Sequence, residues 1–219
     1  MTTKSSLVLL ALILLSAAQV CAQGTGTVVP PQAAEEANAN TWSFAAAAYG
    51  YLIPDDQSYA SGTFRADRNW AHLEARYNYE DHKTGSVWLG YNLSFGEKLV
   101  LEATPMVGGV FGNTTGVAPG YLVTLSYKKI SLYSEGEFVL DTKNADSHFF
   151  YNWNELTYSV SDWLRAGLAS QRTRAYHTPL DVQRGFFAGV TYRRLDFTTY
   201  VFNVGWTSPT ILLGMGFTF

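Results

Sequence analysis

The chain has 219 residues, a formal net charge of −3 and an aromatic content of 15%. Its basic residues are few and scattered, which argues against nucleic acid as a partner. The single cysteine, Cys21, lies in a segment that we expect to be removed, so we predict neither a disulfide framework nor thiolate chemistry. The remaining length suits one domain.

The first residues, 1–22, have the layout of a secretory signal peptide. A basic residue, Lys4, precedes an apolar run at residues 7–15, and cleavage is expected after Ala22. The run is too short for a membrane-spanning helix, which needs about 20 residues. Residues 23–40 are rich in Gly, Pro, Ala, Gln and Asn, and we predict a flexible periplasmic leader there. No later run is long enough to span a bilayer as a helix, so a membrane-spanning structure would have to be built from strands.

From Thr41 onward the sequence alternates with a period of two. In AHLEARYNY, at residues 71–79, the odd positions are apolar or aromatic and the even positions are polar or charged, which is typical of a strand with one apolar face. Counting such runs predicts twelve strands, at residues 41–53, 59–67, 70–80, 85–95, 98–111, 119–128, 130–141, 147–160, 163–173, 181–192, 195–206 and 210–219.

Two kinds of break alternate strictly between these runs. Tight breaks are polar pairs, at residues 68–69, 96–97, 128–129, 161–162 and 193–194. Longer breaks fall at residues 54–58, 81–84, 113–118, 142–146, 174–180 and 207–209. An even number of antiparallel strands with short turns at one end and longer loops at the other is the signature of an outer-membrane β-barrel. Closure also lets every backbone group find a hydrogen bond in lipid.

The last residues, ILLGMGFTF, place Leu213, Met215, Phe217 and Phe219 on one face of a strand. This series is similar to the terminal signal, ending in Phe, that outer-membrane barrels present to their assembly machinery. The sequence thus resembles the bacterial outer-membrane β-barrel class, over residues 1–22 and 41–219. The resemblance implies an all-β fold with a single closed antiparallel transmembrane barrel, short periplasmic turns and longer extracellular loops. It also implies location in the outer membrane, contact of Phe219 with the assembly machinery, and a monomer surrounded by lipid and lipopolysaccharide.

Aromatic residues gather beside the tight turns if the apolar positions face lipid. They would form one girdle at the periplasmic side of the membrane. The residues of this predicted girdle are Trp42, Phe44, Phe95, Tyr127, Tyr158, Trp163, Tyr192, Phe197 and Phe217, with Phe219 at the end of the closing strand.

Charged side chains occupy the opposite phase of the alternation. A basic residue that faced lipid would cost about 2 to 4 kcal/mol at the bilayer midplane. Several such costs together would exceed the free energy of unfolding of a typical domain. We therefore predict a lumen lined by Arg65, His72, Glu74, Arg76, Glu102, Glu135, Glu137, Glu155, Arg165 and Gln183. Distances counted from the tight turns suggest an acidic layer near mid-height with basic residues below it.

The predicted strand number leaves two functions open. Eight strands leave just enough room for side chains, and sixteen to eighteen leave an open channel, so twelve lies between the two. One hypothesis is a narrow porin-like channel for passive diffusion of small hydrophilic solutes or ions. The alternative is a structural or surface-interaction barrel whose lumen is filled by side chains.

A lipid-modifying enzyme is a minority alternative that the sequence disfavours. Asp146, Ser147 and His148 are consecutive, and adjacent residues on a strand point to opposite faces, so they form a poor catalytic set. The other histidines are His72 in the lumen series and His82 and His177 near loops. We expect no enzymatic activity and no cofactor.

Some acidic and basic residues of the sequence could in principle bind a metal ion or a phosphate group. Glu135 and Glu137 share a face, but a hard cation wants several converging oxygen ligands, so we predict no metal site. Arg172, Arg174 and Arg184 lie toward the extracellular rim. They would either hold lipopolysaccharide phosphates, which suit the guanidinium fork, or simply keep a loop soluble.

Overall fold

The computed structural model describes residues 41–53, 58–175, 181–205 and 209–219. The predicted signal peptide at 1–22 and leader at 23–40 lie outside the described residues. Within the described part of the chain, no helix is long and apolar enough to cross a membrane.

The described chain is almost entirely β-structure, with one short 3-10 turn, η1 (Ala145–Ser147). The strands are β1 (Ser43–Leu52), β2 (Tyr59–Arg68), β3 (Ala71–Tyr77), β4 (Thr84–Tyr91), β5 (Leu93–Phe95), β6 (Leu99–Gly112), β7 (Gly116–Tyr127), β8 (Ile130–Asp141), β9 (Phe149–Ser159), β10 (Leu164–Ala175), β11 (Asp181–Tyr192), β12 (Leu195–Phe202) and β13 (Thr210–Thr218).

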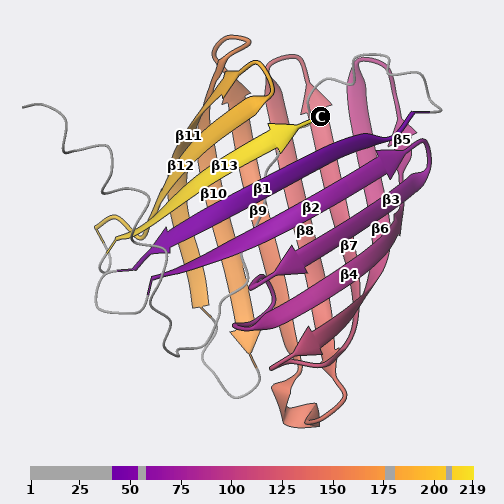
Figure 1. Cartoon of the computed structure of the whole chain (residues 1–219). Coiled ribbons are helices and arrows are strands. Elements are labelled where there is room, and N and C mark those ends of the chain that lie inside the picture. The colour runs from indigo at the N-terminus through magenta and orange to yellow at the C-terminus, as the bar shows by residue number, and fades with distance from the viewer. Residues whose placement is uncertain (1–40, 54–57, 176–180, 206–208) are drawn as a thin grey trace, which may run out of the picture.

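The sheet closes on itself (Figure 1). Every strand is antiparallel to the strands that it pairs with, and β13 returns to pair with β1. β4 and β5 are two pieces of the single strand predicted at residues 85–95. They are separated at Asn92, and both pair with β6. The prediction of a closed antiparallel barrel with twelve strands is therefore confirmed.

The barrel closes where the first and last strands meet. Phe44 and Phe219 exchange both backbone hydrogen bonds, at 3.0 and 2.9 Å, and their rings stack with centroids 5.6 Å apart. Phe64 and Phe217 also pack against the Phe219 ring. The final residue thus belongs to the sheet, and its aromatic side chain caps the outside of the seam.

Two-residue turns join several strands at one end of the barrel. Asn69, Lys128 and Arg193 begin such turns in the left-handed region, with φ of 52°, 54° and 56°. This conformation costs free energy for a residue with a Cβ, and the positive φ matches the twist of a tight hairpin. The opposite end has longer connections, but the loop predicted at 113–118 is shorter than expected, because β7 begins at Gly116.

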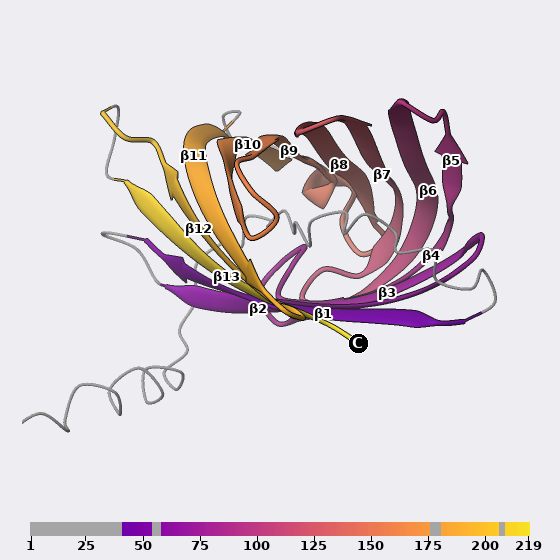
Figure 2. The ribbon, with the colours of Figure 1, turned by 90° about the horizontal axis from the view of Figure 1, so that it is seen from above.

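Side chains partition between the two faces of the wall. The outward positions expose large apolar residues such as Leu89, Val107, Leu168 and Met215. The inward positions are buried and hold both the charged residues and many aromatic rings. Seen from above, β1–β4 form one wall of the barrel and β7–β10 form the facing wall (Figure 2).

Candidate functional site

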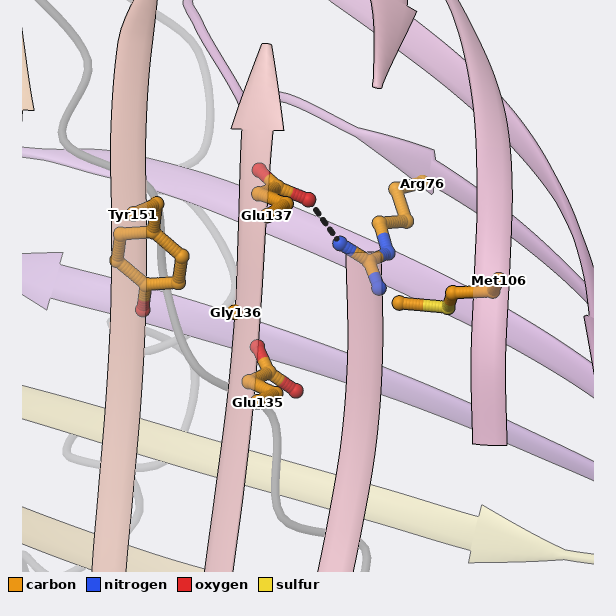
Figure 3. Close-up of a pocket in the computed structure, with 6 residues that line it drawn as sticks. All are labelled: Arg76, Met106, Glu135, Gly136, Glu137 and Tyr151. Carbon is orange, nitrogen blue, oxygen red and sulfur yellow. Dashed lines mark hydrogen bonds and ion pairs between the residues drawn. The ribbon is translucent and has the colours of Figure 1, made fainter. Parts of the chain in front are cut away.

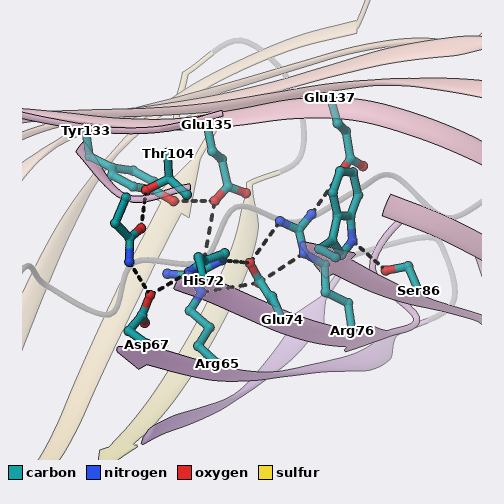
Figure 4. A network of polar contacts seen from close by, with 12 residues as sticks. Arg65, Asp67, His72, Glu74, Arg76, Ser86, Thr104, Tyr133, Glu135 and Glu137 are labelled. Carbon is teal, nitrogen blue, oxygen red and sulfur yellow. Dashed lines mark hydrogen bonds and ion pairs between the residues drawn. The ribbon is translucent and has the colours of Figure 1, made fainter. Parts of the chain in front are cut away.

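Charged side chains from β2, β3 and β8 meet inside the barrel (Figure 4). Arg65 lies directly opposite Glu74 in the β2–β3 ladder, and its Nε is 3.2 Å from Glu74 Oε1. Its terminal nitrogen lies 3.8 Å from Glu135 Oε2, on the facing wall. Tyr133 also donates its hydroxyl to Glu135. The Arg65 guanidinium therefore links strands that are not neighbours in the sheet.

Arg76 makes a second link across the lumen. Its guanidinium donates to both oxygens of Glu74, at 3.0 and 3.2 Å, and to Glu137 Oε2 at 2.8 Å. The same group lies over the rings of Tyr79 and Trp88, 4.3 and 4.6 Å from their centroids. Carboxylates and aromatic faces together surround this cation, which suits a charge removed from water.

A polar chain extends from this network toward the tight-turn end. His72 places Nδ1 2.7 Å from Asp67 Oδ1 and Nε2 3.4 Å from Glu74 Oε2. Asp67 also accepts from Asn92, whose amide oxygen accepts from Thr104 at 2.7 Å. Asn92 is the residue that separates β4 from β5, so the break in the strand supplies a link in the network.

The loop after β3 contributes an acid at the long-loop end of the network. Glu80 accepts hydrogen bonds from Ser86 and, at 3.3 Å, from Trp88 Nε1, while its other oxygen has no partner among the described residues. Burial raises the pKa of Glu80 above its ordinary value, against the attraction of Arg76 and the hydrogen bonds that it accepts.

The half of the lumen formed by β9, β11 and β12 is aromatic instead. Trp153 packs edge-on against Tyr200 and Phe202, with centroids 5.3 and 5.5 Å apart. Phe187 lies 5.2 Å from Tyr200. The acid of this half, Glu155, accepts from Trp153 Nε1 at 2.9 Å and from the Tyr200 hydroxyl at 2.8 Å.

A separate ion pair lies on the same side, closer to the tight turns. Arg165 donates to both oxygens of Asp196, at 2.5 and 2.7 Å, in a bidentate arrangement. Thr191 and Thr198 complete the hydrogen bonds of the carboxylate. Gly189 makes room for this pair, because a Cβ there would lie 2.5 Å from the Arg165 guanidinium carbon.

The centre of the lumen is closely packed. Arg76, Met106, Glu135, Gly136, Glu137 and Tyr151 surround a void too small to hold a water molecule (Figure 3). Arg76 and Glu137 reach toward each other across this void from opposite walls. The side chains at this level therefore leave no room for water between them.

Each residue predicted to line the lumen lies on the inner face. Glu102 differs in being exposed to solvent, because it lies near the tight-turn end of β6. Gln183 is half-buried and accepts from Gln171 Nε2 at 2.7 Å. The buried members are Arg65, His72, Glu74, Arg76, Glu135, Glu137, Glu155 and Arg165.

The predicted acidic layer with basic residues below it is wrong for Arg65, whereas Arg165, near the start of β10, does lie close to the tight turns. Arg65 and Arg76 lie among glutamates at one level, in ion pairs that cross the lumen. The physical reason is the register of the hairpin: Arg65 is directly opposite Glu74, and both are equally far from the turn that joins β2 and β3. A buried guanidinium is also stabilised by carboxylate partners at its own level.

Sequence reasoning missed several interior residues because it assigned large apolar and aromatic side chains to the lipid face. Asp67 and Asp196 occupy inward positions in the alternation of their strands, so that alternation could have predicted them as interior residues. The buried aromatic rings had no such signal, since β9 carries large residues on both faces. The missed residues are Asp67, Tyr79, Glu80, Trp88, Asn92, Tyr133, Tyr151, Trp153, Asp196, Tyr200 and Phe202.

The residues of the predicted girdle lie on the outside of the wall near the tight turns. Phe44 is partly covered, because it packs between Phe64 and Phe219 at the seam. The exposed members are Trp42, Phe95, Tyr127, Tyr158, Trp163, Tyr192, Phe197, Phe217 and Phe219. Their place at a membrane boundary and the role of Phe219 in assembly stay predictions.

The catalytic set considered for Asp146, Ser147 and His148, at and beside the η1 turn, is not assembled. The Nδ1 of His148 accepts the backbone N–H of Asp141 at 3.0 Å, and its ring lies against Phe138. Among the residues that the structure describes, no three His, Cys, Asp or Glu side chains are grouped as metal ligands. His177 and the side chain of Arg174 lie outside the described residues.

No protein-family model and no curated protein matches the chain. Several solved structures are similar in fold, and two of them are structures of the KdgM porin. The KdgM porin has a TM-score of 0.56 and 9% identity, covering 80% of this chain and 99% of the porin. The KdgM porin in complex with disordered oligogalacturonate has a TM-score of 0.52, with the same identity and coverage. The chain thus has the fold of an outer-membrane porin barrel.

Proposed function

We propose that this chain forms a narrow channel in the bacterial outer membrane for small hydrophilic solutes, and that it favours cations over anions. The observation that carries the charge preference is the composition of the interior, where buried carboxylates outnumber the buried guanidinium groups of Arg65, Arg76 and Arg165. The buried carboxylates, without Glu80, whose pKa is raised by burial, are Glu74, Glu135, Glu137, Asp141, Glu155 and Asp196. A low-dielectric passage lined by an excess of one charge concentrates ions of the opposite sign.

This charge balance also bears on the kind of solute. One of the similar porins was solved with oligogalacturonate, which is an acidic oligosaccharide. An acidic chain would meet Glu135 and Glu137 at the closely packed level here, and like charges repel in a low dielectric. The ligand of that porin is therefore not carried over to this chain, and neutral or cationic solutes are the better candidates.

A second function is favoured by one specific observation. Glu135, Glu137 and Tyr151 are at most 3% exposed, and ion pairs join the two walls at their level. A barrel bridged in this way would serve as a rigid structural or surface element without transport. Conduction requires the Arg76–Glu137 contact to open or to leave room for ions beside it.

Single-channel recording in planar bilayers tests both functions. Purified protein is expected to give discrete openings of small conductance, with a reversal potential in a KCl gradient that shows preference for K⁺. The Glu135→Gln/Glu137→Gln double variant should lose much of that preference. Arg193→Ala, on an exposed turn, is the control and should leave it unchanged. Complete silence from correctly folded protein would sink the channel and favour the bridged barrel.

A further inference from the structure

The outer wall carries a polar row where lipid contact is expected. Ser134, Asn154, Ser170 and Arg184 lie directly opposite one another across β8, β9, β10 and β11. All four occupy outward positions, in phase with the exposed leucines of the same strands. Polar side chains on a lipid-facing wall are costly unless they find partners.

Hydrogen bonds within the wall satisfy much of this row. The Asn152 amide donates to the Tyr121 hydroxyl at 2.9 Å and to the Glu135 backbone oxygen at 2.8 Å. The Asn154 amide donates to Asn152 Oδ1 at 2.6 Å and approaches Ser170 Oγ at 3.4 Å. The amides are thereby held in fixed positions on the outside of the barrel.

Two arginines lie beside these amides and take no part in these hydrogen bonds. Arg172 lies opposite Asn152, and Arg184 opposite Ser170, on adjacent strands. Both side chains are exposed, and neither has a hydrogen bond or ion pair with another described residue. Diagonal neighbours of this kind lie about 7 to 8 Å apart, with their Cβ atoms somewhat closer, so two long guanidinium side chains can bind a single anionic group between them.

An apolar row lies directly beside the polar one. Leu132, Leu156, Leu168 and Phe186 are opposite one another on the same four strands, and all are strongly exposed. This row lines a groove of about 520 Å³ on the outside of the wall, together with Asn154, Ser170 and Arg184 of the polar row. That volume is in the range of pockets that hold small ligands. Arg172 is not part of the lining, but it is the diagonal neighbour of Arg184 on the adjacent strand.

The groove thus has a cationic, hydrogen-bonding end and an apolar end. Arg172 lies near the end of β10 and Arg184 near the start of β11, both toward the long-loop end of the barrel. Long loops face the cell exterior in barrels of this type. The cationic end is therefore at the level of the outer leaflet, and the apolar row runs deeper into the membrane.

We infer that this groove binds one phosphate-bearing glycolipid of the outer leaflet, lipopolysaccharide. Its phosphate lies between the guanidinium groups of Arg172 and Arg184, which offer paired N–H donors. An acyl chain lies along Leu132, Leu156 and Leu168. The inference depends on the outer-membrane location in the proposed function, and not on conduction.

Native mass spectrometry of the purified barrel in a neutral detergent tests the site. Added lipopolysaccharide is expected to give a complex with one bound lipid. The Arg172→Ala/Arg184→Ala variant should weaken that complex at least tenfold, and lipopolysaccharide stripped of its phosphates should bind similarly weakly. Arg193→Ala removes an exposed arginine at the opposite end of the barrel and should bind as tightly as the unaltered chain. Leu168→Ser, which spoils the apolar row, should weaken binding without changing the charge.

Several results would overturn this site. Equal binding by the double variant and the unaltered chain would show that the lipid binds elsewhere. Phosphatidylglycerol competing as well as lipopolysaccharide would mean that the groove takes any anionic phospholipid. A dimer joined through this wall would assign the groove to a second copy of the chain. Channel recordings of the double variant keep the two proposals apart, because unchanged openings with lost lipid binding leave the channel standing.

Discussion

The two halves of the barrel interior are stabilised in different ways. In the half formed by β2, β3 and β8, Arg65 and Arg76 connect carboxylates on facing walls. In the half formed by β9, β11 and β12, Trp153 and Tyr200 pack against other rings, with Glu155 as their acid. The contrast shows that a buried charge is held by its partners, whereas a buried ring is held by close contact with its neighbours.

The largest expected effect is on the charged half. Arg76→Ala removes the cation that Glu74 and Glu137 share, and leaves both carboxylates buried without it. We expect the free energy of unfolding to fall by about 3 to 5 kcal/mol, as for other broken buried pairs. Urea titration of the protein refolded into lipid vesicles measures this change. Arg193→Ala, on an exposed turn, is the control. A loss of less than 1 kcal/mol for Arg76→Ala would mean that water replaces the arginine freely.

Trp153→Ala disrupts the packing of the aromatic half of the interior. The indole is fully buried, and its removal leaves a cavity between Tyr200 and Phe202. We expect a loss of about 3 kcal/mol in the free energy of unfolding. If the cavity joins the conduction path, single-channel conductance should rise as well. Trp163→Ala, at an exposed position, is the matched control for both readouts. An unchanged conductance would place the path entirely in the charged half.

A milder change separates packing from hydrogen bonding in the same half. Tyr200→Phe keeps the ring and removes only the hydroxyl that donates to Glu155 at 2.8 Å. Because the acceptor is a carboxylate, we expect a loss of about 2 kcal/mol in the free energy of unfolding. Tyr192→Phe, at an exposed ring, should change it little. Equal values for the two variants would mean that Trp153 alone satisfies the acid.

The smallest expected effect on the free energy of unfolding comes from Glu80, at the long-loop end of the charged half, and it depends on pH. The pKa of Glu80 in the folded state is raised by burial above its ordinary value of 4.5. The folded state therefore holds this proton more tightly than the unfolded state, so stability falls as pH rises from about 4.5 through the folded pKa. Glu80→Gln should remove that decline and leave the variant relatively more stable at neutral pH. Urea titrations across this window compare the two proteins. A parallel pH dependence would assign the decline to other groups.

Much of the fold could be predicted from the sequence because one physical cost dominates. Glu74 and Arg76 occupy alternate positions in β3, and placing them in lipid would be prohibitive. That constraint fixes the phase of each strand, and the polar pairs at Lys128 and Arg193 fix where the chain turns. The division of one predicted strand at Asn92 was not predictable, because the hydrogen bonds of that residue go to Asp67 and Thr104 on other strands.

The outer wall shows where the same reasoning stops. Asn152 and Asn154 are polar, yet they lie on the outward face, while Trp153 between them points inward. A rule that sends polar residues inward and apolar residues outward would reverse this stretch. The register of β9 is set by its neighbours and by the large aromatic cluster inside, so the local pattern is overruled by tertiary packing.

The sequence by itself determined a closed antiparallel barrel, its strands and turns, and the inward placement of its glutamates and arginines. These follow from a period of two and from the cost of charge in hydrocarbon, which act on each strand separately. Only the tertiary structure decided which inward groups meet, because Arg76 and Glu137 come together through the tilt and curvature of the whole wall. It also decided that Arg172 and Arg184 lie beside a row of leucines, since that neighbourhood depends on the register of several strands at once.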